Sequence, residues 1–99
     1  METDGKVLNT DVSRLNFMYK KISIPKMAMA YWMQVPEFVS AMNDLVDRRE
    51  DISDKAVYDV MLPIYEDVLR FKGTDAGKAF NYAQLRRGVK RLEEALASQ

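Results

Sequence analysis

The chain of 99 residues contains no cysteine and no histidine. The lack of cysteine excludes disulfide bonds and thiolate chemistry, and the lack of histidine removes the imidazole that acid–base catalysis and zinc sites commonly use. A glycine-rich phosphate loop and a nucleophile elbow are also missing. Residues 73–77 read Gly-Thr-Asp-Ala-Gly without the Lys-Ser or Lys-Thr that follows a nucleotide loop, so they predict a helix-capping turn. We therefore expect a protein that is not an enzyme, with no cofactor, no metal and no small-molecule substrate.

The sequence also has no long apolar run and no excess of either charge. Residues 1–10 are polar, unlike a signal peptide. The longest apolar-rich run, residues 27–35, is about half the ~20 residues that a bilayer span needs. Basic and acidic side chains number 15 each, and this balance weakens any attraction of the whole molecule to an anionic membrane or a nucleic acid. We expect a cytoplasmic protein, in a bacterium or a phage-infected cell, that does not bind membranes.

What is present almost everywhere is apolar residues at helical spacing, with no competing strand pattern. This predicts an all-α fold in one domain over residues 11–99, preceded by a flexible tail over residues 1–10. Five helices are expected, three short ones and two long ones: residues 11–21, 24–32, 36–51, 54–72 and 75–97. A short turn joins the two long helices, so they should form an antiparallel hairpin over residues 54–97.

Polar residues, prolines and glycines mark the expected helix ends. Ser23, Ser53 and Thr74 can each cap a following helix through a side-chain oxygen. Pro36 suits a first helical position, where its missing N–H costs nothing. Gly73 is a natural terminator of the helix before it.

The hairpin has more apolar surface than a single neighbour covers. Helix 54–72 has two adjacent apolar ridges, and helix 75–97 has a seam at heptad-like spacing that Gly88 weakens. The seam residues are Tyr82, Leu85, Val89, Leu92 and Leu96. A chain of this length buries only roughly 60–65% of its surface as a monomer. We therefore expect a homo-oligomer that assembles through the hairpin.

The zero net charge hides a segregation along the chain. Residues 1–36 have five basic and three acidic side chains, residues 37–67 three and nine, and residues 68–99 seven and three. Four basic residues of the last block gather away from the seam: Arg86, Arg87, Lys90 and Arg91. This basic face either pairs with the acidic third helix, within the chain or across a dimer, or contacts nucleic-acid phosphates, or binds an acidic protein.

Residues 24–45 fit the pattern of a helix-turn-helix. A small residue, Ala28, stands at the expected crossing point, and apolar residues fill the positions that the motif buries. Those positions are Met27, Tyr31, Met33, Phe38 and Ala41. Groove-compatible side chains on and after the second helix are Ser40, Asn43, Arg48 and Arg49. Against the motif, Trp32 stands where the turn prefers glycine and the second helix is acidic. The alternative is a packed corner of a small bundle.

Residues 36–48 read Pro-Glu-Phe-Val-Ser-Ala-Met-Asn-Asp-Leu-Val-Asp-Arg. This stretch of 13 among 99 residues resembles one in the small terminase subunits of short-tailed phages. Proteins of that family are helical, assemble into rings and engage viral DNA for packaging. The resemblance implies DNA contact from the helix-turn-helix-like part, residues 11–51, and ring assembly through the hairpin.

A cluster of methionine and aromatic side chains surrounds the expected second helix. Its members are Met27, Met29, Tyr31, Trp32 and Met33. Methionine is flexible, and tryptophan and tyrosine are frequent anchors, so an exposed cluster of this kind suits a protein partner. The alternative is a central helix whose side chains are covered by helix 54–72.

Two functions of different classes follow from these features. The first is a DNA-binding regulator or phage DNA-packaging-type factor that uses the helix-turn-helix-like part and the basic face and that self-associates. The second is a protein-binding modulator, such as an inhibitor, an adaptor or an anti-host factor, that acts through the methionine and aromatic cluster or the basic face.

Overall fold

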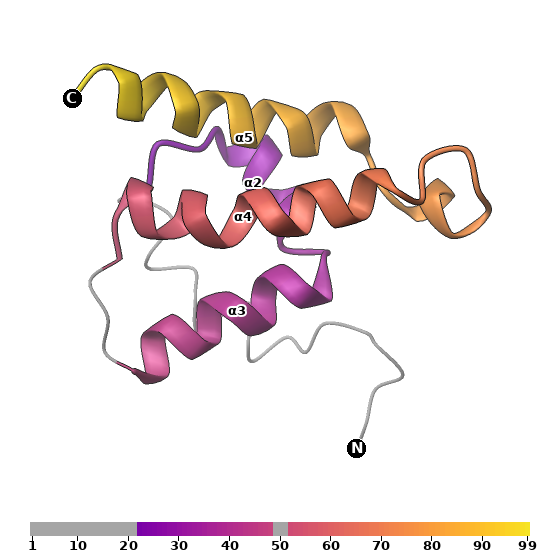
Figure 1. The fold of residues 1–99 in the computed structure, drawn as a ribbon, viewed down its shortest axis with the longest axis horizontal. Coiled ribbons are helices and arrows are strands. Elements are labelled where there is room, and N and C mark those ends of the chain that lie inside the picture. The colour runs from indigo at the N-terminus through magenta and orange to yellow at the C-terminus, as the bar shows by residue number, and fades with distance from the viewer. Residues whose placement is uncertain (1–21, 49–51) are drawn as a thin grey trace.

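The structure, a computed structural model, describes residues 22–48 and 52–99 (Figure 1). Within these ranges the chain forms helices and no strand, which confirms the all-α class for this part. The elements are α2 (Lys26–Trp32), α3 (Pro36–Asp47), α4 (Asp54–Leu69), the 3-10 helix η2 (Ala76–Ala79) and α5 (Tyr82–Ala97). The expected helix 11–21, the tail 1–10 and Arg49 lie outside the described residues.

The starts of α3 and α4 confirm the expected boundaries. Pro36 is the first residue of α3 and follows Val35, whose backbone is extended at φ −95° and ψ 108°. Ser53 caps α4, since its Oγ accepts the backbone N–H of Ala56 at 3.2 Å. Both boundaries depend on local chemistry alone, which is why the sequence is sufficient to place them.

Helix α2 begins at Lys26, two residues later than expected, and Ser23 does not cap it. Pro25 precedes the helix in an extended conformation with ψ 142°, and no side chain caps α2. Ser23 instead donates its backbone N–H to Asp54 Oδ1 at 2.8 Å. The segment before α2 is thereby tied to the first residue of α4.

The connection between the long helices is longer than expected, because α4 ends at Leu69 and α5 begins only at Tyr82. Gly73 has the left-handed φ of 89° that a terminating glycine adopts. Thr74 does not cap α5. Its Oγ1 donates to the carbonyl oxygen of Phe71 at 2.6 Å and accepts the N–H of Gly77 at 3.2 Å, so it closes a local turn.

Backbone geometry explains why α5 cannot extend back to Asp75. Phe80 is extended, with φ −100° and ψ 139°, and interrupts the helical path. Its ring lies 6.0 Å from that of Tyr82 in an edge contact. Asn81 then caps α5, since its Oδ1 accepts the N–H of Gln84 at 3.2 Å. The expected helix start at Asp75 and the expected Thr74 cap are therefore wrong.

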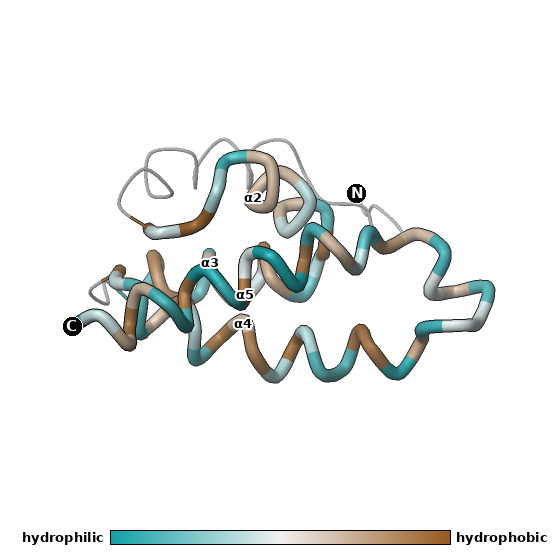
Figure 2. The backbone as a smooth tube through the Cα atoms, turned by 90° about the horizontal axis from the view of Figure 1, so that it is seen from above, coloured by the Kyte–Doolittle hydropathy of each residue, from teal (hydrophilic) through white to brown (hydrophobic). Residues whose placement is uncertain are grey.

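Helices α4 and α5 pack side by side and run in opposite directions, α2 packs mainly on α5, and α3 packs on α4 (Figure 1). Hydrophobic positions recur among hydrophilic ones along these helices (Figure 2). The core between them holds the largest fully buried side chains: Trp32, Phe38, Met29, Met42, Met61, Leu85 and Leu92. The seam of α5 thus packs against α2 and α4 of the same chain.

Candidate nucleic-acid interface

The basic face of α5, defined as Arg86, Arg87, Lys90 and Arg91, is exposed at all four positions. Its position follows from the core, since Leu85, Val89 and Leu92 are buried on the inner side of the same helix. With 3.6 residues per turn, the basic residues then fall on the outer side. The expectation that the four side chains share one face of α5 agrees with this arrangement.

The ion pairs of this face lie along α5 itself. Lys90 Nζ is 3.6 Å from Glu93 Oε1, and Arg91 Nη1 is 3.5 Å from Glu94 Oε1. In both pairs the two side chains are at least 40% exposed, and exposed ion pairs of this kind contribute little to stability. Arg86 and Arg87 form no ion pair with any residue that the structure describes. The acidic helix α3 packs on α4, so it does not supply the described partners of the basic face.

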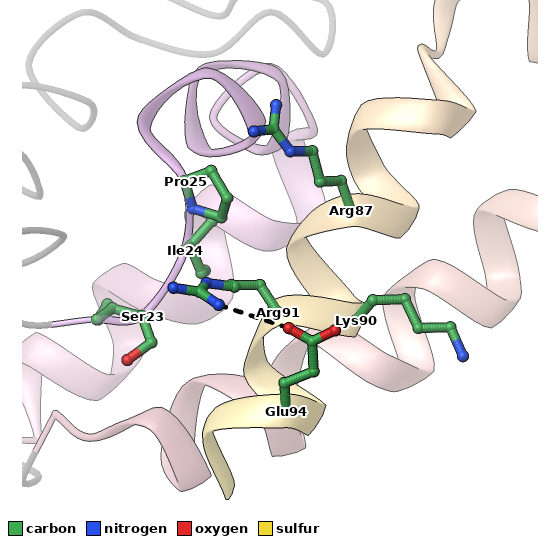
Figure 3. Close-up of a pocket in the computed structure, with 8 residues that line it drawn as sticks. Ser23, Ile24, Pro25, Arg87, Lys90, Arg91 and Glu94 are labelled. Carbon is green, nitrogen blue, oxygen red and sulfur yellow. Dashed lines mark hydrogen bonds and ion pairs between the residues drawn. The ribbon is translucent and has the colours of Figure 1, made fainter. Parts of the chain in front are cut away.

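A groove of about 620 Å³ borders the basic face on the side of α2. Its walls are the segment 22–25 and the α5 residues Arg87, Lys90, Arg91 and Glu94. The Arg91 guanidinium lies beside Ile24, the Arg87 side chain extends beyond Pro25 toward α2, and Lys90 points the other way (Figure 3). The groove therefore joins two guanidinium groups to a small apolar floor.

Arg86 lies on the other flank of the basic face, next to α4. Burial raises the pKa of the Tyr65 phenol on α4, and the positive charge of Arg86 partly offsets that rise. Tyr65 in turn packs on the Trp32 ring, with 6.4 Å between the ring centroids. Arg86 and Arg87 are neighbours in sequence but lie about 100° apart around α5, on different flanks of the basic face, so they form a matched pair for mutagenesis.

A polar contact also joins α4 to α5 beside the basic face. The Tyr58 hydroxyl donates a hydrogen bond to Glu93 Oε2 at 2.9 Å. This bond is the main cause that raises the pKa of Tyr58 above its ordinary value of 10.0, and burial and nearby carboxylates act in the same direction. The folded state therefore favours the protonated phenol.

This linkage predicts a loss of stability in alkali. A raised folded-state pKa stabilises the fold at pH values below the ordinary pKa of 10.0, and the contribution disappears as the pH rises through the raised pKa. We expect the Tyr58→Phe variant to lose less free energy of unfolding than the parent between pH 9 and pH 11, as measured by urea titration. Equal losses in the two proteins would show that the Tyr58–Glu93 bond does not stabilise the fold.

No family model matches the chain, and no curated protein or solved structure matches it. In the described ranges, none of the helices has the length and apolar character needed to cross a membrane. Residues 22–48 and 52–99 likewise contain no group of three or more acidic side chains placed to hold a metal ion. We therefore infer the function of the chain from its own geometry.

Helix α3 shows little of the surface that a DNA-reading helix requires. Ser40 is exposed, but Asn43 is buried, with 9% of its surface accessible. Asn43 Nδ2 donates to the carbonyl oxygen of Val39 at 3.0 Å, and its Oδ1 has no hydrogen-bond partner among the described residues. Asn43 is thus unavailable to a DNA groove, which corrects its expected position. Arg48 is exposed at the end of α3, while the other exposed charges of α3 are acidic: Glu37, Asp44 and Asp47.

The turn between α2 and α3 departs from the expected motif in its packing. Trp32 is the last residue of α2, and Met33 follows it in a right-handed conformation with φ −68°, so the bulk of Trp32 causes no backbone strain there. Ala28, Met33 and Phe38 are buried as the motif requires, but Met27 is 59% exposed, so its expected burial is wrong. Because α2 packs mainly on α5 rather than α3, the bundle itself explains the apolar match.

The methionine and aromatic cluster divides between core and surface. Met29, Trp32 and Met33 are buried, and Trp32 Nε1 donates to the carbonyl oxygen of Leu85 at 3.0 Å. These three side chains are thus closed to a partner of the folded chain, contrary to the exposed-cluster interpretation, and α5 covers them more than α4 does. Tyr31 is half-buried beside a smaller cavity of about 320 Å³. Met27 is the one of the five that is exposed, at 59%.

Proposed function

We propose that the chain is a non-enzymatic DNA-binding protein that contacts backbone phosphates through the basic face of α5. The observation that supports this most is the exposure of four cations within six residues, two of which, Arg86 and Arg87, have no carboxylate partner among the described residues. Guanidinium groups suit phosphate oxygens because they offer several N–H donors in one plane. Phosphate contacts position a protein on DNA without reading the bases.

The proposed mode differs from reading a groove with α3. The exposed side of α3 is acidic, and such side chains repel phosphates. Binding is therefore expected to depend strongly on salt and weakly on base sequence, as suits an accessory or packaging-type factor. Self-association would place several basic faces on one duplex. The exposed Leu69 and Phe71, at 36% and 45%, offer apolar surface for it at the end of α4.

A salt titration with two double variants tests this proposal. Parent protein should shift a duplex of random sequence at low salt, with an affinity that falls steeply as salt rises. The R86Q/R87Q variant should flatten the slope of log affinity against log salt by roughly 2, since each lost phosphate contact removes about 0.9. The R70Q/K78Q variant has the same net charge and loses two side chains that are both 80% exposed near the α4–α5 connection, so its slope should not change.

Two results would contradict the proposal. One is the lack of any shift by the parent protein at low salt. The other is an equal loss in both double variants, because it would show that net charge, and not the basic face, governs binding. An unlabelled competitor duplex distinguishes this function from binding of an acidic protein, since only a DNA complex is displaced by it.

A further inference from the structure

We propose that the groove between residues 22–25 and α5 is a phosphate-binding subsite, with Arg87 and Arg91 as its ligands. Its assignment to a backbone phosphate of DNA rests on the proposed function above. The phosphate chemistry itself rests on the groove, whose volume of about 620 Å³ accommodates a phosphate group and an attached sugar.

The two arginines line the groove from successive turns of α5. They are four residues apart on α5, a spacing that puts side chains roughly 5–6 Å apart at their Cβ atoms on one side of a helix. Arg91 reaches Ile24 and Arg87 reaches toward the start of α2 beyond Pro25, whereas Lys90 points away from the groove (Figure 3). The two positive charges repel each other, and an anion with phosphate oxygens bound in the groove would relieve the repulsion through charge-assisted hydrogen bonds.

The opposite wall completes the subsite. Ser23 and Pro25 line the groove with Ile24, which is 8% exposed and therefore fixed in the core below. The position of this wall is held by the hydrogen bond from the Ser23 backbone N–H to Asp54 Oδ1. Apolar side chains at this wall suit the sugar next to a phosphate, because they exclude water without competing for its oxygens.

Glu94 is the internal competitor of the bound anion. Its carboxylate also lines the groove and lies 3.5 Å from Arg91 Nη1, with both side chains more than half exposed. A pair this long and exposed is weak, so a phosphate group bound in the groove should displace it. Removal of the Glu94 charge should then strengthen anion binding, a change that a purely structural role for Glu94 would not produce.

The test uses inorganic pyrophosphate and the isotope-labelled full chain in an NMR titration. The amide signals of Ile24 and Arg91 should shift and saturate. Arg87→Gln should weaken the affinity about tenfold or more, since a hydrogen bond between charged groups is lost. Arg86→Gln removes the same charge from the other flank of α5 and should weaken it no more than about threefold. Glu94→Gln should strengthen it about threefold.

Equal weakening by Arg86→Gln and Arg87→Gln, or shifts that never saturate, would overturn the subsite and show only diffuse attraction to α5. A second titration with a duplex that has 5′-hydroxyl ends distinguishes the source of the phosphate. Shifts of the same signals support a backbone phosphate. The remaining outcome is that pyrophosphate binds the variants in the expected order of affinity while the duplex does not bind at all. The subsite would then be a site for a small phosphate compound, and the proposed DNA function would fail.

Discussion

Replacing Trp32 with alanine should remove about 3–5 kcal/mol from the free energy of unfolding. The side chain is completely buried, its ring lies 5.0 Å from that of Phe38, and its Nε1 donates to the carbonyl oxygen of Leu85. Large-to-small changes of this kind cost about 3–5 kcal/mol. Domains are stable by only about 5–15 kcal/mol, and short chains bury a smaller fraction of their surface than long ones. The loss is therefore comparable to the lower end of that range of stability.

Far-ultraviolet circular dichroism in urea measures this loss without depending on the mutated residue. Trp32→Phe is the matched control, because it keeps an aromatic ring in the core and loses the hydrogen bond to Leu85, and we expect it to stay folded. Since the chain has a single tryptophan, the parent should also show blue-shifted emission that moves to the red on unfolding. A Trp32→Ala variant as stable as Trp32→Phe would mean that this ring does not hold α2, α3 and α5 together.

Local chemistry explains which helix ends the sequence predicts well. Pro36 and Ser53 act on the residues directly after them, and no distant contact overrides them. Thr74 has the same capping chemistry, but the Phe71 carbonyl lies within reach and its hydroxyl closes a turn there instead. A cap residue alone therefore does not show which of two neighbouring backbone segments it will serve.

The basic face was predictable and the groove was not. The spacing of the apolar residues predicts which side of α5 is buried. The basic residues then lie on the side that stays exposed. The groove depends on the approach of Ile24 to α5, across more than sixty residues of chain, and no local pattern contains that contact. Its arginine ligands could be proposed from the sequence only as members of a general basic face.

Two misplaced features, Asn43 and the methionine and aromatic cluster, had a signal in the sequence. Asn43 lies four residues after Val39, on the edge of the buried stripe of α3, so helical spacing alone places it near the core. Met29 and Trp32 are three residues apart and share one side of α2, while Met27 falls on another side. In both cases residue type suggested a surface role, whereas helical periodicity indicated the position that the structure shows.

Gly88 is the residue that allows α5 to approach α2 so closely. A Cβ built at this position would lie 2.8 Å from Trp32 Nε1 and 3.0 Å from Trp32 Cδ1. The indole is rigid, and its hydrogen bond to the Leu85 carbonyl prevents an easy retreat. The sequence marks Gly88 only as a weak point of the helix, yet its missing side chain is what lets the indole reach the backbone of α5.

The Gly88→Leu variant should accordingly lose about 1–2 kcal/mol of stability. Leucine gains up to about 1 kcal/mol in helix propensity, but overpacking a buried contact typically costs 1–3 kcal/mol and sometimes more. Ala83→Leu introduces the same side chain at an exposed position of α5 and should change stability by less than about 0.5 kcal/mol. The Gly88→Leu change is then measured again by urea titration in a Trp32→Phe background, which makes a double-mutant cycle. The smaller ring should recover part of the Gly88→Leu loss, whereas additive losses would show that α5 does not rest on the indole.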